Sequence, residues 1–236
     1  MIVKNNFFDS YPEFYKTSPV GTFPNRLNHR YKALIENNKQ IISDATILDL
    51  ASHDGRWSFP ALMNGASKVI GIEGRRDLVE NCNGTMKKYG ISNEKYSFIT
   101  GNIFDEIENI HEKIDVVFCF GIFYHVMNHM SLLSLIKKLE PRYIIMDSHV
   151  SNYNEPVIEM RLENTFRHSA AIQTNVKEHT VIGRPSKKAI ELMLSYFDFD
   201  YSYYDWQNSG ITNWDNIEDY RRGNRITLLA KNNSLK

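Results

Sequence analysis

The chain has no excess of charge, almost no cysteine and no long apolar run. Its 28 Lys and Arg residues balance its 28 Asp and Glu residues across 236 positions. No overall field therefore attracts nucleic acid or an anionic membrane surface, although a local basic patch stays compatible with neutrality. No window approaches the roughly 20 apolar residues that span a bilayer, and the first residues lack the apolar stretch of a secretory signal.

The low cysteine content points to a reducing compartment. The sequence holds Cys82 and Cys119 alone, which is too few for a disulfide framework. Cys119 lies in an apolar run, where we expect a buried thiol. The sequence thus predicts a cytoplasmic protein without membrane contact, and it gives no indication of oligomeric state.

What the chain does contain is an alternation of short apolar runs with helical patterns, which is typical of an α/β fold with a doubly wound, Rossmann-like sheet. The predicted strands are residues 46–50, 68–72, 96–100, 114–120, 143–146, 201–204 and 226–229. The predicted helices are residues 25–35, one beginning near Ser58, residues 77–89, one carrying Leu132 to Leu139, and one from Pro185 to Phe197. Because no helix separates the last two strands, we expect a mostly parallel seven-stranded sheet with an antiparallel closing strand.

Three segments depart from that alternation. Residues 1–44 predict an N-terminal flap followed by a helix, ahead of one domain over residues 45–236. Residues 148–184 are polar and weakly patterned, and we expect them to form an insertion or lid. Near the end stand the aromatic residues Tyr201, Tyr203, Tyr204 and Trp206. For these we favour core packing over stacking on a base or sugar.

The residues that follow each predicted strand bear most on function, because ligands of open parallel sheets bind beyond the carboxyl ends of the strands. Asp49 ends the first strand and Glu73 the second. A carboxylate at the second strand suits ribose hydroxyls, and one at the first suits a cationic amino group. No G-x-G-x-x-G pattern follows the first strand, which argues against a nicotinamide-dependent oxidoreductase.

The order and spacing of these strand-end residues resemble the class I S-adenosylmethionine (SAM) dependent methyltransferases, over roughly residues 45–150 and the closing strand pair. The first motif of that family is commonly D-x-G-x-G-x-G. Here Asp49 supplies the acid, Ala51 and His53 replace the first two glycines, and Gly55 supplies the third. The departure is compatible with the motif if Ala51 keeps an ordinary backbone conformation.

The resemblance implies methyl transfer from SAM, with S-adenosylhomocysteine (SAH) as the product, in a domain over residues 45–236. It places Asp49 at the methionine amino group, Glu73 at the ribose and Asn102 at the adenine. Gly121 would permit a close approach to the methionine portion. The cofactor-binding residues implied are Asp49, Ala51, Ser52, Asp54, Gly55, Trp57, Glu73, Gly74, Arg75, Asn102, Ile103, Phe120 and Gly121. Arg26 and Arg30 would cover the cofactor carboxylate or be solvated, and we favour the second.

The acceptor side shows a shorter resemblance. The segment 121–125, Gly-Ile-Phe-Tyr-His, resembles the G-x-x-Y-H stretch of the enzymes that carboxymethylate wobble uridine in transfer RNA, and Gly-Arg-Pro-Ser at 183–186 echoes the same group. His125 is the first candidate for a general base and His149 the second, with Tyr124 orienting the acceptor. Each histidine could equally be structural. His125 and His129 are spaced as on one helix face, but no Glu lies between them as in H-E-x-x-H, so we predict no metal site.

The function predicted is therefore methyl transfer to a hydroxyl or amine of a small, sugar-like molecule. A small-molecule acceptor is favoured because no broad basic surface is evident in the sequence. An enzyme that methylates transfer RNA or another RNA is the alternative substrate class. A non-catalytic SAM-binding or regulatory protein is the alternative of a different kind, favoured by the altered glycine motif.

Overall fold

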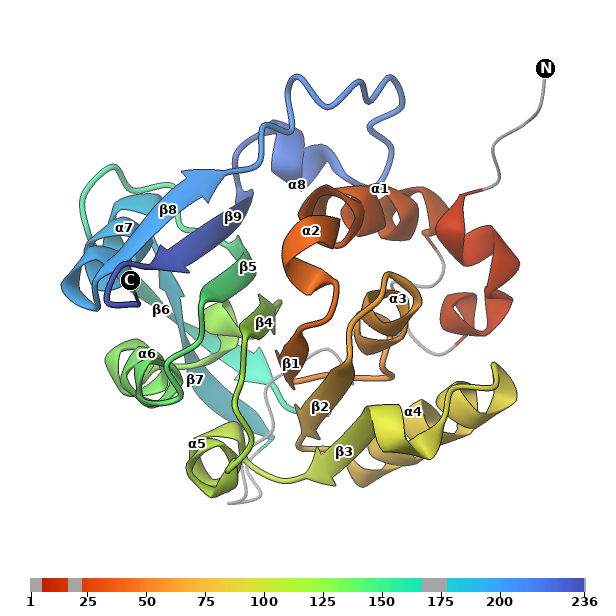
Figure 1. Ribbon diagram of the computed structural model, residues 1–236. Coiled ribbons are helices and arrows are strands. Elements are labelled where there is room, and N and C mark those ends of the chain that lie inside the picture. Colours follow the sequence, from red (N-terminus) through yellow and green to blue (C-terminus); the bar gives the residue numbers. More distant parts are fainter. Residues whose placement is uncertain (1–5, 17–22, 167–177, 236) are drawn as a thin grey trace.

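The structure, a computed structural model, describes residues 6–16, 23–166 and 178–235. One seven-stranded sheet runs through it in the order β3-β2-β1-β4-β5-β9-β8, with helices on both faces (Figure 1). Its strands are β1 (Thr46–Leu50), β2 (Lys68–Glu73), β3 (Tyr96–Thr100), β4 (Val116–Phe120), β5 (Tyr143–His149), β8 (Phe199–Tyr203) and β9 (Arg225–Asn232). The pairs among β1 to β5 are parallel, and β9 is antiparallel to both β5 and β8. The predicted α/β fold and its antiparallel closing pair are confirmed.

The helices form because their apolar positions recur on one face, which packs on the sheet. They are α1 (Pro24–Leu34), α2 (Lys39–Ile42), α3 (Ser58–Met63), α4 (Arg76–Lys88), α5 (Ile103–Glu106), α6 (His129–Lys138), α7 (Lys187–Tyr196) and α8 (Glu218–Arg221). Helix α7 begins after Ser186, whose hydroxyl accepts a hydrogen bond from the Ala189 N–H at 3.1 Å. No helix in the described ranges is long and apolar enough to cross a membrane.

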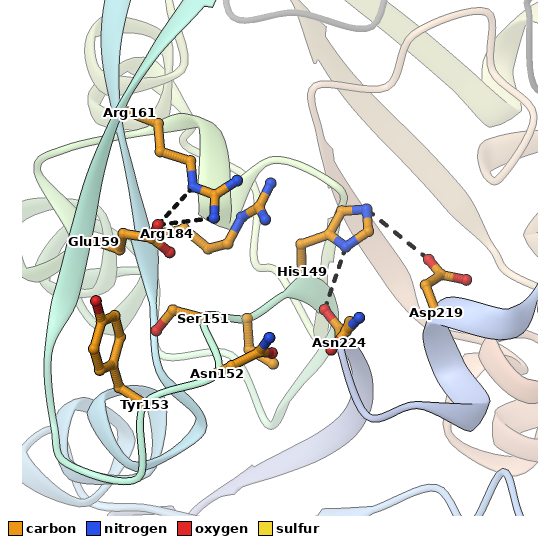
Figure 2. A pocket seen from close by; sticks show the side chains of 10 residues that line it. His149, Ser151, Asn152, Tyr153, Glu159, Arg161, Arg184, Asp219 and Asn224 are labelled. Carbon is orange, nitrogen blue, oxygen red and sulfur yellow. Dashed lines mark hydrogen bonds and ion pairs between the residues drawn. The ribbon is translucent and has the colours of Figure 1, made fainter.

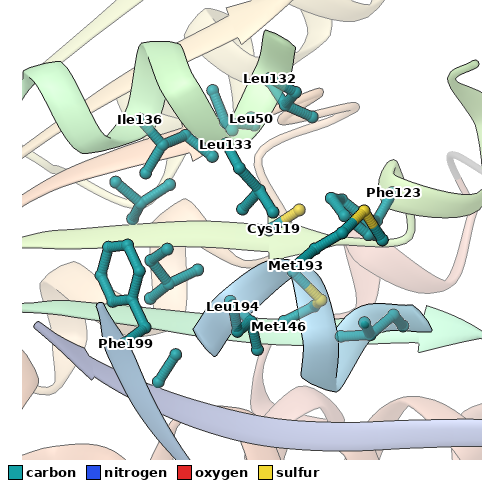
Figure 3. Close-up of a cluster of buried hydrophobic side chains, with 14 of the residues drawn as sticks. Leu50, Cys119, Phe123, Leu132, Leu133, Ile136, Met146, Met193, Leu194 and Phe199 are labelled. Carbon is teal, nitrogen blue, oxygen red and sulfur yellow. The ribbon is translucent and has the colours of Figure 1, made fainter. Parts of the chain in front are cut away.

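Two apolar cores cover the two faces of the sheet. Leu133 and Ile136 of α6 and Leu194 of α7 pack on one face, where Cys119 is completely buried as predicted (Figure 3). Burial raises the pKa of the Cys119 thiol to about 12, so this group stays protonated and unreactive. Because β4 is covered from both sides, all five of its residues are buried and apolar.

The second core contains the described part of the N-terminal segment. Phe8 and Phe14, in the short turns η1 (Phe7–Ser10) and η2 (Pro12–Tyr15), are almost fully buried. Phe8 packs edge-on against Trp57, with the ring centroids 6.1 Å apart. A third cluster holds the buried Trp206 on Tyr220, so core packing is confirmed for that tryptophan. For Tyr201, which is exposed on β8, the expectation is wrong.

The predicted insertion contains two strands that the sequence analysis missed. Strands β6 (Ile158–Asn164) and β7 (His179–Pro185) pair antiparallel as a separate two-stranded sheet, which we call the hairpin. The hairpin docks on the turn after β4, because the Gly183 N–H donates to the Val126 carbonyl at 3.1 Å. The rest of the predicted lid, residues 167–177, lies outside the described residues, as do residues 1–5 and 17–22 of the predicted flap.

Candidate active site

The loop after β1 keeps the backbone of a glycine-rich turn with fewer glycines. Ala51 and His53 both have φ +55° and Gly55 has φ +76°. The condition that Ala51 keep an ordinary backbone conformation is therefore not met. Each non-glycine residue in this left-handed region costs about 1–2 kcal/mol, so surrounding contacts must hold it. Two of these are the hydrogen bonds from the His53 N–H to Glu73 Oε2 (2.9 Å) and from the Ser52 N–H to the Ile72 carbonyl (3.0 Å).

Asp49 is a buried carboxyl group at the end of β1. The Ser58 hydroxyl donates to its Oδ2 at 2.6 Å, and within the described part of the chain no cation pairs with it. Burial, helped by the charges of Glu73 and Asp54, raises the Asp49 pKa to about 7. A cationic ligand group placed beside this carboxylate would restore its ionised form.

Asp54 differs from Asp49 because it already has its cation. Arg56 Nη2 lies 2.6 Å from Asp54 Oδ2, and His53 Nδ1 lies 3.4 Å from Oδ1. Burial opposes ionisation of Asp54, but the Arg56 charge outweighs it and holds the pKa of that carboxyl well below its usual range. Asp54 thus forms a structural ion pair with Arg56 within the loop. The nearby Ser52 hydroxyl is buried with no hydrogen-bond partner among the described residues.

Glu73 ties the loops after β1 and β2 together. Its Oε1 accepts from the Arg75 N–H at 3.0 Å, opposite the bond that Oε2 makes to His53. Each carboxylate oxygen retains a second acceptor site, so ribose hydroxyls remain compatible with these bonds. Asn102 likewise has a local role, because its side-chain oxygen accepts from the Phe104 N–H at 3.1 Å and caps α5.

Gly121, the first residue after β4, lies beside Arg225 and the candidate residue Tyr124. It has φ +81°, and a Cβ placed on it would lie 3.5 Å from Arg225 Nη2 and 3.8 Å from the Tyr124 hydroxyl. Beside it Trp57 packs edge-on against Phe120 at 5.8 Å. Glycine here gives the chain a left-handed bend and leaves space for a close approach.

The arginines of the N-terminal helix are not solvated, so that expectation is wrong. Arg30 is buried, with its guanidinium 4.8 Å above the Trp57 ring and Nη2 3.0 Å from Asp147 Oδ1. Arg26 donates two hydrogen bonds to the Asp219 carboxylate, at 2.7 and 2.8 Å. Both side chains fix the helix to the carboxyl-end side of the sheet.

A buried charge cluster lies at the end of β5. Asp147 Oδ1 accepts from Arg225 Nε at 2.6 Å and from Arg30, and Oδ2 accepts from the Tyr220 hydroxyl at 2.7 Å. Burial opposes ionisation of Asp147, but Arg225 and Arg30 hold its pKa well below the usual range. Because two guanidinium groups face one carboxylate, the cluster carries a net positive charge. It also holds Arg225 in place, with Nη1 3.4 Å from the Tyr124 hydroxyl.

His125 is held by a carboxylate from the hairpin. Its Nδ1 lies 2.7 Å from Glu163 Oε2. Since a carboxylate only accepts, Nδ1 carries a hydrogen, and Nε2 is the ring nitrogen that Glu163 does not contact. His129 is a separate buried ring whose Nε2 donates to the Gly183 carbonyl at 3.1 Å. The two histidines belong to η7 (Phe123–His125) and α6 and do not share a helix face, so that part of the expectation is wrong.

His149 is the second histidine of the site. Its Nδ1 donates to the Asn224 carbonyl at 3.3 Å, and its ring meets the Tyr124 ring edge-on at 4.9 Å. Burial and the charge of Arg225 lower the His149 pKa to about 3. The imidazole is therefore neutral at physiological pH.

A pocket of about 420 Å³ opens beside His149 (Figure 2). Its walls come from the end of β5 and the turn that follows, from both strands of the hairpin, and from α8. The residues that line it are His149, Val150, Ser151, Asn152, Tyr153, Glu159, Arg161, Arg184, Asp219 and Asn224. The segment expected to be an insertion thus supplies most of the wall of a pocket next to a candidate base.

The profile of the methyltransferase domain family matches residues 41–216. The chain belongs to this family. The methyltransferase resembles the N-terminal domain of EvdMO1, solved with SAH and D-fucose, at a TM-score of 0.62 and 14% identity over 88% of this chain and 82% of that one. It resembles the DhpI–SAH complex at a TM-score of 0.60 and 13% identity over 96% and 97% of the two chains.

A third similar structure is magnesium protoporphyrin IX methyltransferase (ChlM) from Synechocystis PCC 6803 with bound SAM. The TM-score is 0.56 and the identity 13%, over 97% of this chain and 85% of that one. At such identities the likeness shows the fold. No curated protein matches the chain. Family and fold together make the chain a class I SAM-dependent methyltransferase domain.

The methyltransferase brings its predicted residues together in two groups. Asp49, Asp54 and Glu73 lie around the loop after β1, while Tyr124, His125 and His149 form one aromatic cluster. Among the remaining candidates, Ile103 is buried in a core, and Arg75 Nη2 donates to the Thr165 carbonyl at 2.8 Å, next to the hairpin. Gly74 follows Glu73 at the bend between β2 and α4.

The methyltransferase also uses residues that sequence reasoning missed. Asp147 had a readable signal, because it is an acid at the end of an apolar strand, like Asp49 and Glu73. Glu163 had a weaker one, the alternation of apolar and charged residues along β6. For Arg225, at the start of the last strand, no local pattern marked the position. Arg184 stands in the Gly-Arg-Pro-Ser segment at 183–186 but was not assigned to a pocket.

Proposed function

We propose that this methyltransferase transfers the methyl group of SAM to a hydroxyl or amine of a small, sugar-like molecule. The observation that carries the proposal is the contact chain from the pocket to Gly121. His149 lines the pocket and packs on Tyr124, whose hydroxyl lies 3.8 Å from the position of a Cβ on Gly121. The acceptor pocket and the cofactor side of the sheet thus meet at Tyr124. The similar EvdMO1 domain was solved in the presence of D-fucose, which supports a sugar-like acceptor.

The residues around the loop after β1 fit SAM. Asp49 is a buried carboxyl group without a cation among the described residues, which suits the methionine ammonium group. Glu73 would bind the ribose hydroxyls, and Asn102 with Ile103 the adenine. The left-handed turn from Ala51 to Gly55 and the bend at Phe120–Gly121 would admit the methionine portion. SAM supplies an activated methyl group on its sulfonium centre when bound.

The protein's own part in the chemistry is positioning and proton transfer. His125 would accept the acceptor's proton at Nε2, because Glu163 holds the hydrogen on Nδ1. Tyr124, fixed by Arg225, would align the acceptor, and the neutral His149 would contact it within the pocket. Orientation of this kind supplies up to about 7–11 kcal/mol of barrier reduction, and the donor itself is already activated.

Calorimetric titration with SAM and with SAH tests the cofactor assignment first. We expect saturable one-to-one binding of both, lost in Asp49→Ala. A screen of hydroxyl- and amine-bearing small molecules, with total transfer RNA as a separate arm, then measures SAH release. Methylation of RNA alone would replace the small-molecule proposal. Cofactor binding without turnover in every arm would favour the non-catalytic alternative.

A further inference from the structure

Arg184 differs from the other buried or half-buried arginines of this methyltransferase. It lies on β7 directly opposite Glu159 of β6, and its side chain reaches into the pocket beside Arg161 (Figure 2). Within the described residues its guanidinium forms no ion pair or hydrogen bond, and its Nε is buried without a partner. A half-buried guanidinium in this condition has lost part of its hydration without compensation.

The acidic residues that line the pocket are already paired with other cations. Glu159 pairs with Arg161 of the same strand, β6, whose Nη2 and Nε donate to Glu159 Oε1 at 2.8 and 3.0 Å. On the opposite wall, Asp219 receives both hydrogen bonds from Arg26. With Arg26 included, three guanidinium groups thus face two carboxylates around the pocket. Arg184 is the one of the three that has no hydrogen bond or ion pair among the described residues, and the charges of Glu159 and Glu163 act on it without direct contact. Burial and the charge of Arg161 lower the pKa of Arg184, as expected for a guanidinium crowded by a like charge.

We propose that Arg184, supported by Arg161, binds an anionic oxygen group, a carboxylate or a phosphate, on the methyl acceptor. A planar guanidinium binds such groups through two parallel hydrogen bonds. The anionic group would lie at the hairpin end of the pocket and the methylated atom at the His149 end. The acceptor class is thus an acidic sugar-like molecule or a sugar phosphate. This inference rests on the proposed function, because it assigns the pocket to the acceptor.

Nuclear magnetic resonance of arginine side chains tests the subsite directly. Protein labelled with ¹⁵N-arginine and saturated with SAH is titrated with sodium phosphate and, separately, with sodium acetate, at constant ionic strength set by chloride. We expect the Arg184 Nε–H signal to shift saturably. Saturation by phosphate alone points to a phosphorylated acceptor, and saturation by both anions includes carboxylates.

Three variants make the result specific. Arg184→Gln should weaken anion binding at least about tenfold, because a charge-assisted hydrogen bond is lost. Arg184→Lys, which keeps the charge, should weaken it less. Arg76→Gln is the matched control, since Arg76 is exposed and pairs with Glu80 on the surface of α4. Arg76→Gln should leave the affinity for both anions unchanged.

The outcomes separate this inference from the proposed function. A shift at Arg184 that is linear in anion concentration, or binding that survives in Arg184→Gln, overturns the anion subsite while SAH binding still stands. Failure of SAH to bind overturns the cofactor assignment, and the same titration of the ligand-free protein still reports on Arg184.

Discussion

The proposed cofactor side, around the loop after β1, and the proposed acceptor side, at the end of β5, are built from contacts of different range along the chain. Around the loop after β1, Arg56 pairs with Asp54 two residues away, and Ser58 bonds Asp49 nine residues away. At the end of β5, Arg30 reaches Asp147 across 117 residues. The first group is readable as a motif, because its members are close in sequence. The second exists only once the sheet has closed.

The two sides also differ in charge, although the whole chain is neutral. Asp49, Asp54 and Glu73 are buried near one buried guanidinium, that of Arg56. Two guanidinium groups face Asp147 on the acceptor side, and Arg161 and Arg184 lie beyond them in the pocket. The first arrangement suits the ammonium group of methionine, and the second suits an anionic acceptor. The zero net charge of the whole chain gives no indication of either local charge distribution.

Asp147→Asn should have the largest effect, because it removes the carboxylate that holds two buried guanidinium groups. We expect a loss of about 3–5 kcal/mol in the free energy of unfolding. Urea unfolding at pH 7.5 measures it. Asp205→Asn, at an exposed turn, is the control and should stay within about 0.5 kcal/mol of the wild type. An equally small change at Asp147 would show that the cluster does not hold the acceptor side together.

Asp49→Asn should act in the opposite direction on stability. The Asp49 pKa is raised to about 7 in the folded protein from 3.8 in the unfolded chain, so folding favours the protonated form. This contribution is fully present below pH 4 and is lost as the pH rises through 7. An amide cannot ionise, so the variant should be more stable than the ligand-free wild type by about 2–4 kcal/mol at pH 8. At pH 4 the two should be nearly equal.

The same carboxyl group should make cofactor binding depend on pH. If Asp49 binds the methionine ammonium group, SAM affinity of the wild type should fall up to about tenfold per pH unit below 7, as the carboxyl protonates. Asp49→Asn should bind weakly with no such slope. Calorimetry at pH 6 and pH 8 measures both. A pH-independent wild-type affinity would place the ammonium group elsewhere.

Glu163→Gln should separate catalysis from cofactor binding. The glutamine amide can donate to His125 Nδ1 as well as accept from it, so the tautomer is no longer fixed, and we expect kcat to fall about 10- to 100-fold. SAM affinity should not change, because Glu163 lies on the hairpin. Glu80→Gln, at an exposed helix position, is the matched control. An unchanged kcat in Glu163→Gln would move the role of base from His125 to His149.

The features that could be predicted from the sequence are those that depend on residues close together along the chain. The strands of the sheet and the acids Asp49 and Glu73 were readable because apolar runs and strand ends are local features. Glu163 was not assigned, because its partner His125 lies 38 residues away and only the closed fold brings the two together. Arg225 was missed for the same reason, since its partner Asp147 is 78 residues distant.

Ala51 gives the smallest expected effect and the sharpest test of the loop geometry. Ala51→Gly relieves left-handed strain of about 1–2 kcal/mol, but it also increases the conformational entropy of the unfolded chain, which costs about 0.4–1 kcal/mol. The net gain in stability should therefore lie between zero and about 1.6 kcal/mol. Ala61→Gly, inside α3, is the opposite case and should destabilise by about 1 kcal/mol. Thermal unfolding of both variants measures whether each substitution raises or lowers the stability. If both lose stability alike, Ala51 is not strained, and the resemblance of this turn to a glycine-rich loop does not extend to its backbone.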